Sequence, residues 1–122
     1  MIEFKKLDME ISICKLLTMG NINWQSPFVH LSKTDEEISL ACITGQEPAD
    51  AIAVEAGWAA LRLPTTPDTS LVRLASELLD LLEKNKIGLF VLSTFNTDYL
   101  MIRQRNYEQA IQILSGAGYA IS

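Results

Sequence analysis

Two short stretches of the sequence gather side chains that could bind a small ligand. In the first, residues 93–98 (STFNTD) place hydroxyls, an amide and a carboxylate between two apolar runs. A hairpin turn needs only one or two turn residues there. A carboxylate at the edge of an apolar strand needs donors, so an ammonium or a guanidinium group would suit Asp98. Alternatively, Asp98 accepts hydrogen bonds from the backbone of its own turn.

The second stretch, residues 65–71 (TTPDTSL), precedes a leucine-rich helical pattern. Backbone N–H groups at the start of a helix attract an anion, and the carboxylate of a free amino acid fits such a position. Alternatively, Asp68 or Ser70 caps the helix, which is worth about 1 kcal/mol. The candidate ligand-binding residues from the two stretches are Thr66, Asp68, Ser70, Leu71, Thr94, Asn96 and Asp98.

No metal site is expected. His30 is the sole histidine, and a structural zinc site nearly always takes four ligands of the usual types. Cys14 and Cys42 lie in strand-like runs, where small buried thiols are common, so we interpret them as reduced core residues. We likewise interpret Trp24 and Trp58 as packing residues. We therefore expect neither a metal nor a cofactor.

No enzyme is predicted either, because no nucleophile has a paired base in the sequence. Ferredoxin-like acylphosphatases use an Arg with an Asn, and Arg103 and Asn96 are present. Nothing in their spacing singles them out, so this enzyme class is the less favoured alternative. A ligand-free oligomerisation module is a further alternative.

The second half of the chain has the pattern of an α+β fold. Residues 57–64 alternate like a half-buried strand, and residues 71–86 carry leucines at helical spacing. Two apolar strands, which we expect to be buried on both faces, flank the polar cluster. A second helix follows from Asn106, with Gln109 completing a capping box, and a short strand ends the chain. This order predicts a ferredoxin-like βαββαβ unit.

The first half looks like a reduced version of the same unit. Its three expected strands are MEISICKLL, PFVHLSKT and ISLACIT, with TDEE as the turn between the last two. No helical pattern lies between them. Residues 45–56 are rich in Ala and connect the halves, and they could add a further strand. We therefore expect a mostly β unit in residues 1–56 and a complete unit in residues 57–122.

Composition limits the partners. Ten Lys and Arg against fifteen Asp and Glu give a net charge of -5, so the basic surface that nucleic-acid binding needs is missing. No apolar stretch reaches the length of a signal peptide or a membrane span. We expect a cytoplasmic protein without nucleic-acid or membrane partners.

Several stretches together resemble the bacterial CASTOR-type ACT domain family, small proteins built from two ACT-like units. The elements EEISLAC, GWAALR, SLV and LSTFNTDYL and the final helix occur in the family's order. The resemblance covers roughly residues 10–122. It implies a regulatory sensor that binds an amino acid, since ACT domains bind amino acids, commonly at domain or subunit interfaces. The chain departs from the family in having one complete unit, so a site shared by two complete units could be missing or could form between two chains.

The strand pattern also predicts a homodimer. The runs IGLFVL and YLMI are apolar on both faces, whereas the two helices of a ferredoxin-like unit cover one face of its sheet. Part of the other face must therefore meet the reduced unit or a second chain.

Overall fold

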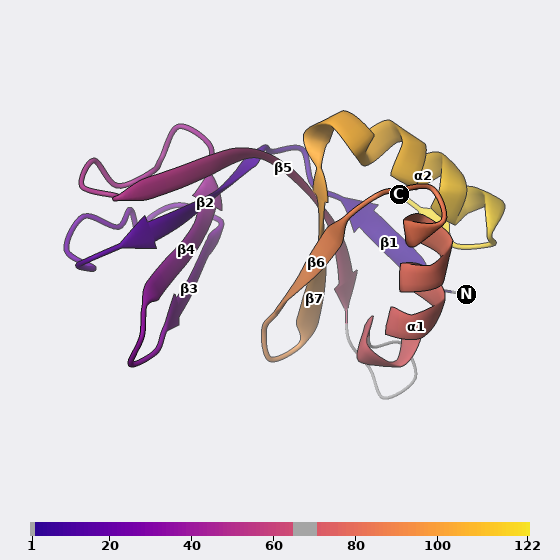
Figure 1. Ribbon diagram of the computed structural model, residues 1–122, viewed down its shortest axis with the longest axis horizontal. Coiled ribbons are helices and arrows are strands. Elements are labelled where there is room, and N and C mark those ends of the chain that lie inside the picture. Colours follow the sequence, from indigo (N-terminus) through magenta and orange to yellow (C-terminus); the bar gives the residue numbers. More distant parts are fainter. Residues whose placement is uncertain (1, 65–70) are drawn as a thin grey trace. The chain divides into compact units, whose positions relative to one another are not determined.

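The computed structural model describes residues 2–64 and 71–122, with all their side chains except those of residues 71–75. The chain divides into two compact units (Figure 1). Unit 1 comprises Met1–Asp8 and Ala59–Ser122, and unit 2 comprises Met9–Trp58. Strand β5 (Ala53–Pro64) supplies residues to both units. The functional division into residues 1–56 and 57–122 stays a prediction.

Unit 2 is a sheet with the strand order β3-β4-β2-β5. The three strands expected in the first half are confirmed, and the connecting segment adds the start of β5 at Ala53. Within residues 9–58, all of which the structure describes, there is no helix. The strands contributed by this part of the chain alone are β2 (Ile11–Leu16), β3 (Val29–Lys33) and β4 (Ile38–Ile43).

The β3–β4 turn lies where the sequence predicts it. The Thr34 backbone N–H donates to the Glu37 carbonyl at 2.9 Å. The Thr34 side-chain oxygen accepts hydrogen bonds from the backbone N–H groups of Glu36 and Glu37, at 3.1 and 3.2 Å. A Thr side chain that bonds its own turn in this way fixes the register of the hairpin.

Unit 1 has the predicted α+β, ferredoxin-like organisation. Its sheet has the order β8-β1-β5-β7-β6. The described elements are β1 (Glu3–Lys6), the second part of β5, α1 (Leu71–Glu83), β6 (Leu89–Ser93), β7 (Thr97–Arg103), the 3-10 helix η1 (Gln104–Asn106), α2 (Tyr107–Gly116) and β8 (Ala120–Ile121).

Strand β1 is an addition that the sequence pattern does not predict. It lies between β5 and β8, pairing antiparallel with β5 and parallel with β8. In a plain βαββαβ unit the last strand would lie beside the first. Here a strand from the N-terminal end of the chain occupies that position.

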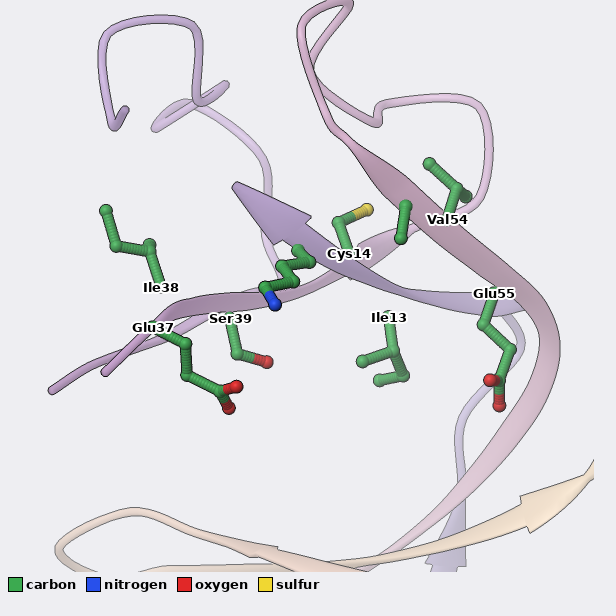
Figure 2. A pocket seen from close by; sticks show the side chains of 9 residues that line it. Ile13, Cys14, Glu37, Ile38, Ser39, Val54 and Glu55 are labelled. Carbon is green, nitrogen blue, oxygen red and sulfur yellow. The ribbon is translucent and has the colours of Figure 1, made fainter. Parts of the chain in front are cut away.

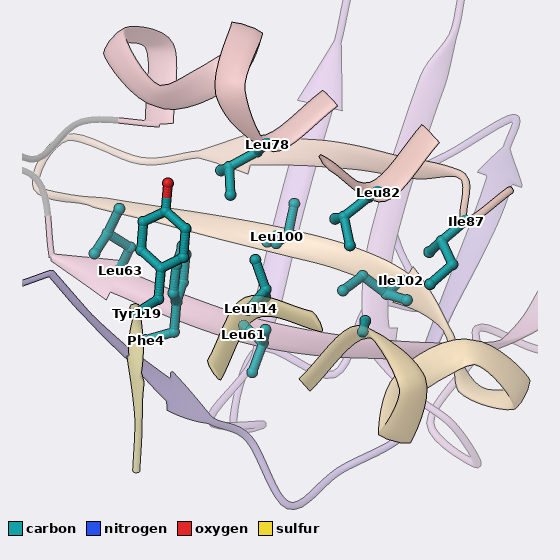
Figure 3. Packing of buried hydrophobic residues seen from close by; sticks show 11 residues of the cluster. Phe4, Leu61, Leu63, Leu78, Leu82, Ile87, Leu100, Ile102, Leu114 and Tyr119 are labelled. Atoms are coloured by element: carbon teal, nitrogen blue, oxygen red, sulfur yellow. The ribbon is translucent and has the colours of Figure 1, made fainter. Parts of the chain in front are cut away.

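The core of unit 1 lies between its helices and its sheet (Figure 3). Leu78 and Leu82 of α1 and Leu114 of α2 point toward the apolar side chains of the strands. Phe4 of β1 is fully buried and meets Tyr119 edge-on, with ring centroids 5.8 Å apart. The predicted leucine face of the first helix is confirmed for the residues whose side chains are described.

Tyr119 also ties β8 to α1, because its hydroxyl donates to Glu77 Oε1 at 2.6 Å. Burial, followed by this hydrogen bond and the Glu77 charge, raises the pKa of Tyr119 to about 12. The hydroxyl therefore stays protonated and keeps donating throughout the neutral range.

Three local expectations are wrong. Asn106 makes no side-chain capping bond, because η1 precedes α2 and gives Asn106 a helical backbone instead of the extended one of a cap. Strand β6 is not buried on both faces, and Val91 is 41% exposed. Among the described strands β6 pairs with β7 alone, so it lies at an edge. Trp58 is buried as expected, but Trp24 is 57% exposed and is not a packing residue.

In the part of the chain that the structure describes, no helix is both long and apolar enough to span a membrane.

Candidate functional site

The β6–β7 hairpin positions the carboxylate at the centre of the predicted site. Ser93 and Asp98 are direct cross-strand partners, and the Ser93 hydroxyl donates to Asp98 Oδ1 at 2.6 Å. Asp98 is 4% exposed. Because side chains alternate along a strand, it shares a face with Leu100 and Ile102 of the unit 1 core. The hairpin thus places a buried carboxylate at the end of an apolar face.

The two other predicted hairpin residues are exposed. The Thr94 backbone N–H and hydroxyl both donate to the Thr97 carbonyl, at 2.8 and 3.2 Å, so Thr94 closes the turn. Asn96 is exposed at the tip beside Phe95, which is 97% exposed. The structure therefore brings Asp98 together with Ser93, and not with Thr94 or Asn96. The hairpin register is the signal that could have added Ser93 to the site.

The other half of the predicted site lies mostly outside the described residues. This holds for Thr66, Asp68 and Ser70. Leu71 is the first residue of α1, and its side chain also lies outside the described part. A site formed by the helix start and the hairpin therefore stays a prediction.

The environment of Asp98 suits either a ligand or a structural role. A buried carboxylate requires hydrogen-bond donors, since removing its charge from water costs several kcal/mol. The Ser93 hydroxyl supplies one donor. An ammonium group meeting the same carboxylate would add a charge-assisted bond, which is roughly twice as strong as a neutral one. Binding of an amine-containing ligand is the chemistry that this arrangement allows.

A second buried polar group in unit 2 was missed from the sequence. Ser12 is fully buried, and its hydroxyl donates to Glu47 Oε2 at 2.7 Å and lies 2.8 Å from Thr44 Oγ1. The Gly45 N–H donates to Glu47 Oε1 at 2.9 Å. The Ser12 hydrogen bond is the main cause that lowers the pKa of Glu47. This group fixes the segment after β4 onto β2, and its only sequence signal is a Ser on the buried face of β2.

The cysteines are core residues, as predicted. Cys14 and Cys42 are free and buried, and both belong to the core cluster of unit 2. Burial raises the pKa of both thiols, to about 12 for Cys42, so they are protonated at neutral pH. His30 lies on β3 and is half-buried. Among the described residues no group of His, Cys, Asp and Glu is arranged to hold a metal ion.

The residues of the acylphosphatase alternative are not assembled. Asn96 precedes β7 and Arg103 is the last residue of the strand. A seven-residue strand is roughly 20 Å long, so the two side chains lie at opposite ends. The pair therefore cannot act on one phosphoryl group.

Comparison with protein families supplies the missing context. The model of the ACT domain matches residues 53–116, which is more than half of the chain. The chain belongs to the ACT domain family. Comparison with curated proteins finds no match.

Several solved structures match the chain over nearly its whole length. Protein Atu0741 from Agobacterium tumefaciens is 26% identical, with a TM-score of 0.83 over 99% of this chain and 92% of that one. The regulatory subunit of aspartate kinase from Thermus thermophilus is 10% identical, with a TM-score of 0.55 over 92% of this chain and 95% of that one. Aspartate kinase from Clostridium acetobutylicum is 12% identical, with a TM-score of 0.62 over 92% of this chain and 33% of that one. The last two show a shared fold.

Proposed function

We propose that this protein is a regulatory sensor that binds an amino acid or a similar small ligand and has no catalytic activity. Membership of the ACT domain family is the observation that carries the proposal. The likeness in fold to a regulatory subunit of aspartate kinase supports it. Within the family, the sequence favours the CASTOR-type proteins. We place the sensor in the cytoplasm.

The ligand site that we propose lies between the start of α1 and the β6–β7 hairpin. Backbone N–H groups at Ser70 and Leu71 would hold the ligand carboxylate. Asp98 would accept from its ammonium or basic side chain. The 4% exposure of Asp98 supports this role, because a charge-assisted bond is stronger where water is excluded.

Calorimetry on an Asp98→Asn variant tests the proposal. A thermal-shift screen of the twenty amino acids first selects the ligand, since a ligand at 100 times its dissociation constant stabilises by about 2.7 kcal/mol. The loss of a charge-assisted bond should then weaken binding about tenfold to a hundredfold. Asp80→Asn on α1 is the matched control, because Asp80 is exposed and lies in the same unit.

Two results would contradict this site. If Asp98→Asn leaves affinity unchanged and lowers the melting temperature strongly, Asp98 only holds its hairpin together with Ser93. If no amino acid shifts the melting temperature of the wild type, the sensor proposal itself fails.

We also propose a homodimer. On the face of unit 1 opposite its helices, the half-buried Phe90, Leu92 and Tyr99 lie beside the fully buried Met101 and make an apolar strip along the edge strand β6. Light scattering at micromolar concentration should give twice the mass of the chain, with an interface above about 1,000 Å² in crystals. A dimer that responds to no amino acid would favour the alternative function, an oligomerisation module without a ligand. A monomer would remove both the dimer and that alternative.

A further inference from the structure

Unit 2 has a pocket on one face of its sheet, with a volume of about 330 Å³ (Figure 2). This volume is at the lower end of the roughly 300–1,000 Å³ found for small-molecule sites. Ile13, Glu37, Ser39 and Glu55 point to one side of the sheet, and Cys14, Ile38 and Val54 point to the other. The pocket is built from β2, the start of β4 and the start of β5.

The strand register fixes the order of charges along this pocket. Lys15 lies between Ser39 of β4 and Ala53 of β5. On the same face, Ile13 lies two residues before Lys15 and pairs with Glu55. Glu37 lies two residues before Ser39, at the opposite end of the pocket from Glu55. The Lys15 ammonium group therefore lies diagonally between the carboxylates of Glu55 and Glu37, so the charges along the pocket are negative, positive and negative.

The spacing of the two carboxylates limits which ligands can meet both. Glu37 and Glu55 are two strands apart and four residue positions apart along the strand direction, which places their Cα atoms about 16 Å from each other. A ligand with one amino group reaches one of these flexible side chains. A ligand that meets both needs a second amino group several bonds from the first. Between the two carboxylates, the half-buried Ile13 and the methyl group of the exposed Ala53 offer an apolar floor for a methylene chain.

We infer that this pocket binds a small molecule with one carboxylate and two separated amino groups. The ligand carboxylate meets Lys15, one amino group meets each Glu, and the methylene chain lies over Ile13. The net charge of the three protein groups, -1, matches the +1 of such a ligand. Every lining residue belongs to unit 2, so this site is separate from the one proposed at Asp98 and does not depend on it.

A titration of the full chain, followed by amide NMR spectroscopy, tests the site. The probe is L-lysine. L-norleucine serves as the analogue without the second amino group, and 1,5-diaminopentane as the analogue without the carboxylate. L-lysine should shift the amide signals of residues 13–15, 37–39 and 53–55. Each analogue should bind about tenfold more weakly, since each loses one charge-assisted bond.

Variants separate this site from any other lysine-binding site. Glu37→Gln and Lys15→Met should each weaken L-lysine binding about tenfold, whereas the control Glu36→Gln should not. Glu36 is the matched control because it is exposed and neighbours Glu37, with its backbone bound to the same Thr34 oxygen. Unchanged amide signals elsewhere will show that each variant is folded.

Two outcomes would overturn the inference. One is equal affinity for L-lysine and L-norleucine. The other is a set of shifts confined to unit 1 that Glu37→Gln leaves unchanged. That second outcome would leave the Asp98 site intact, so the two proposals fail separately.

Discussion

The two units of this protein stabilise their sheets in different ways. In unit 1 the helices cover one face of the sheet, and eleven buried residues form the core cluster among the side chains that the structure describes. In unit 2 no helix covers the sheet within the fully described residues 9–58, and the corresponding cluster has five buried residues. Buried apolar area is the main stabilising term in small domains. The smaller cluster of unit 2 therefore buries less apolar area to offset the entropy of folding.

Unit 2 compensates with polar contacts over long sequence separations. Ser12 and Glu47 join positions 35 residues apart. The Thr18 hydroxyl also donates to Asp50 Oδ2 at 3.1 Å, between two exposed segments. A reduced unit without helices can therefore keep its strand order through hydrogen bonds that close its loops. It also leaves large apolar side chains such as Leu17 exposed.

The largest expected effect tests whether β1 is integral to unit 1. Phe4→Ala removes a fully buried aromatic side chain and should destabilise unit 1 by about 3–5 kcal/mol. Urea unfolding combined with amide hydrogen exchange would measure it. Lys6→Ala, an exposed site on the same strand, is the control and should cost less than about 0.5 kcal/mol. Similar values for both variants would mean that β1 is dispensable.

A smaller effect is expected from the equivalent change in unit 2. Leu40→Ala should cost about 2–3 kcal/mol, at the low end for such a cavity, because loop residues such as Ile22 can move into the space. Hydrogen exchange should accelerate for the amides of β2 and β4 and not for those of α2. Equal acceleration in both units would show that their stabilities are coupled.

The polar group of unit 2 predicts a specific sensitivity to acid. Hydrogen bonds hold the pKa of Glu47 below its ordinary value of 4.5. The contribution of Glu47 to the free energy of unfolding is therefore complete above pH 4.5. It is lost as pH falls through the lower pKa of the folded state. Glu47→Gln should lower the free energy of unfolding by about 1 kcal/mol at pH 7. It should also reduce the loss of stability at acid pH, the acid limb of the stability curve. Stability measured against pH, with the exposed Glu10→Gln as control, would check it; identical acid limbs in the three proteins would refute it.

The smallest expected effect is a gain in unit 1. Lys86 has φ of 59°, a left-handed conformation that favours glycine, and it follows α1 where the Ile87 N–H bonds the Leu82 carbonyl at 3.0 Å. Lys86→Gly should raise stability by up to about 1 kcal/mol. Lys84→Gly should instead lower it, because the Lys84 N–H still bonds the Asp80 carbonyl in helical fashion. Thermal melts of both variants would show opposite shifts, and shifts of the same sign would exclude strain at Lys86.

Periodicity predicted most of the fold, and the exceptions have physical reasons. The leucines of α1 carry a strong pattern because helical spacing places them on one face, whereas in β5 the run from Trp58 to Leu61 is buried at every position and does not alternate. Strand β1 carries no such pattern, since Phe4 is its one buried residue. The capping box at Asn106 failed because a 3-10 turn, which shares the same residues, replaces the extended backbone of a cap.

The candidate site was predictable to the extent that it depends on local register. Asp98 follows from a polar cluster in a short hairpin, and its pairing with Ser93 follows from the length of the turn. The Ser12–Glu47 contact was not predictable, because nothing near either residue specifies a partner 35 positions away. The charge order around Lys15 needed the register of three strands, which sequence patterns do not give.

The parallel pairing of β1 with β8 affects the order in which the protein can fold during synthesis. Residues 3–6 leave the ribosome long before residues 120–121, yet these two segments are neighbours in one sheet. On one side β1 can pair with β5 as soon as that strand is made, but its other edge stays open until the last strand arrives. Contacts between such distant residues close slowly, because a long loop must be ordered first. The nascent chain therefore carries an unpaired strand edge, the kind of surface that chaperones protect.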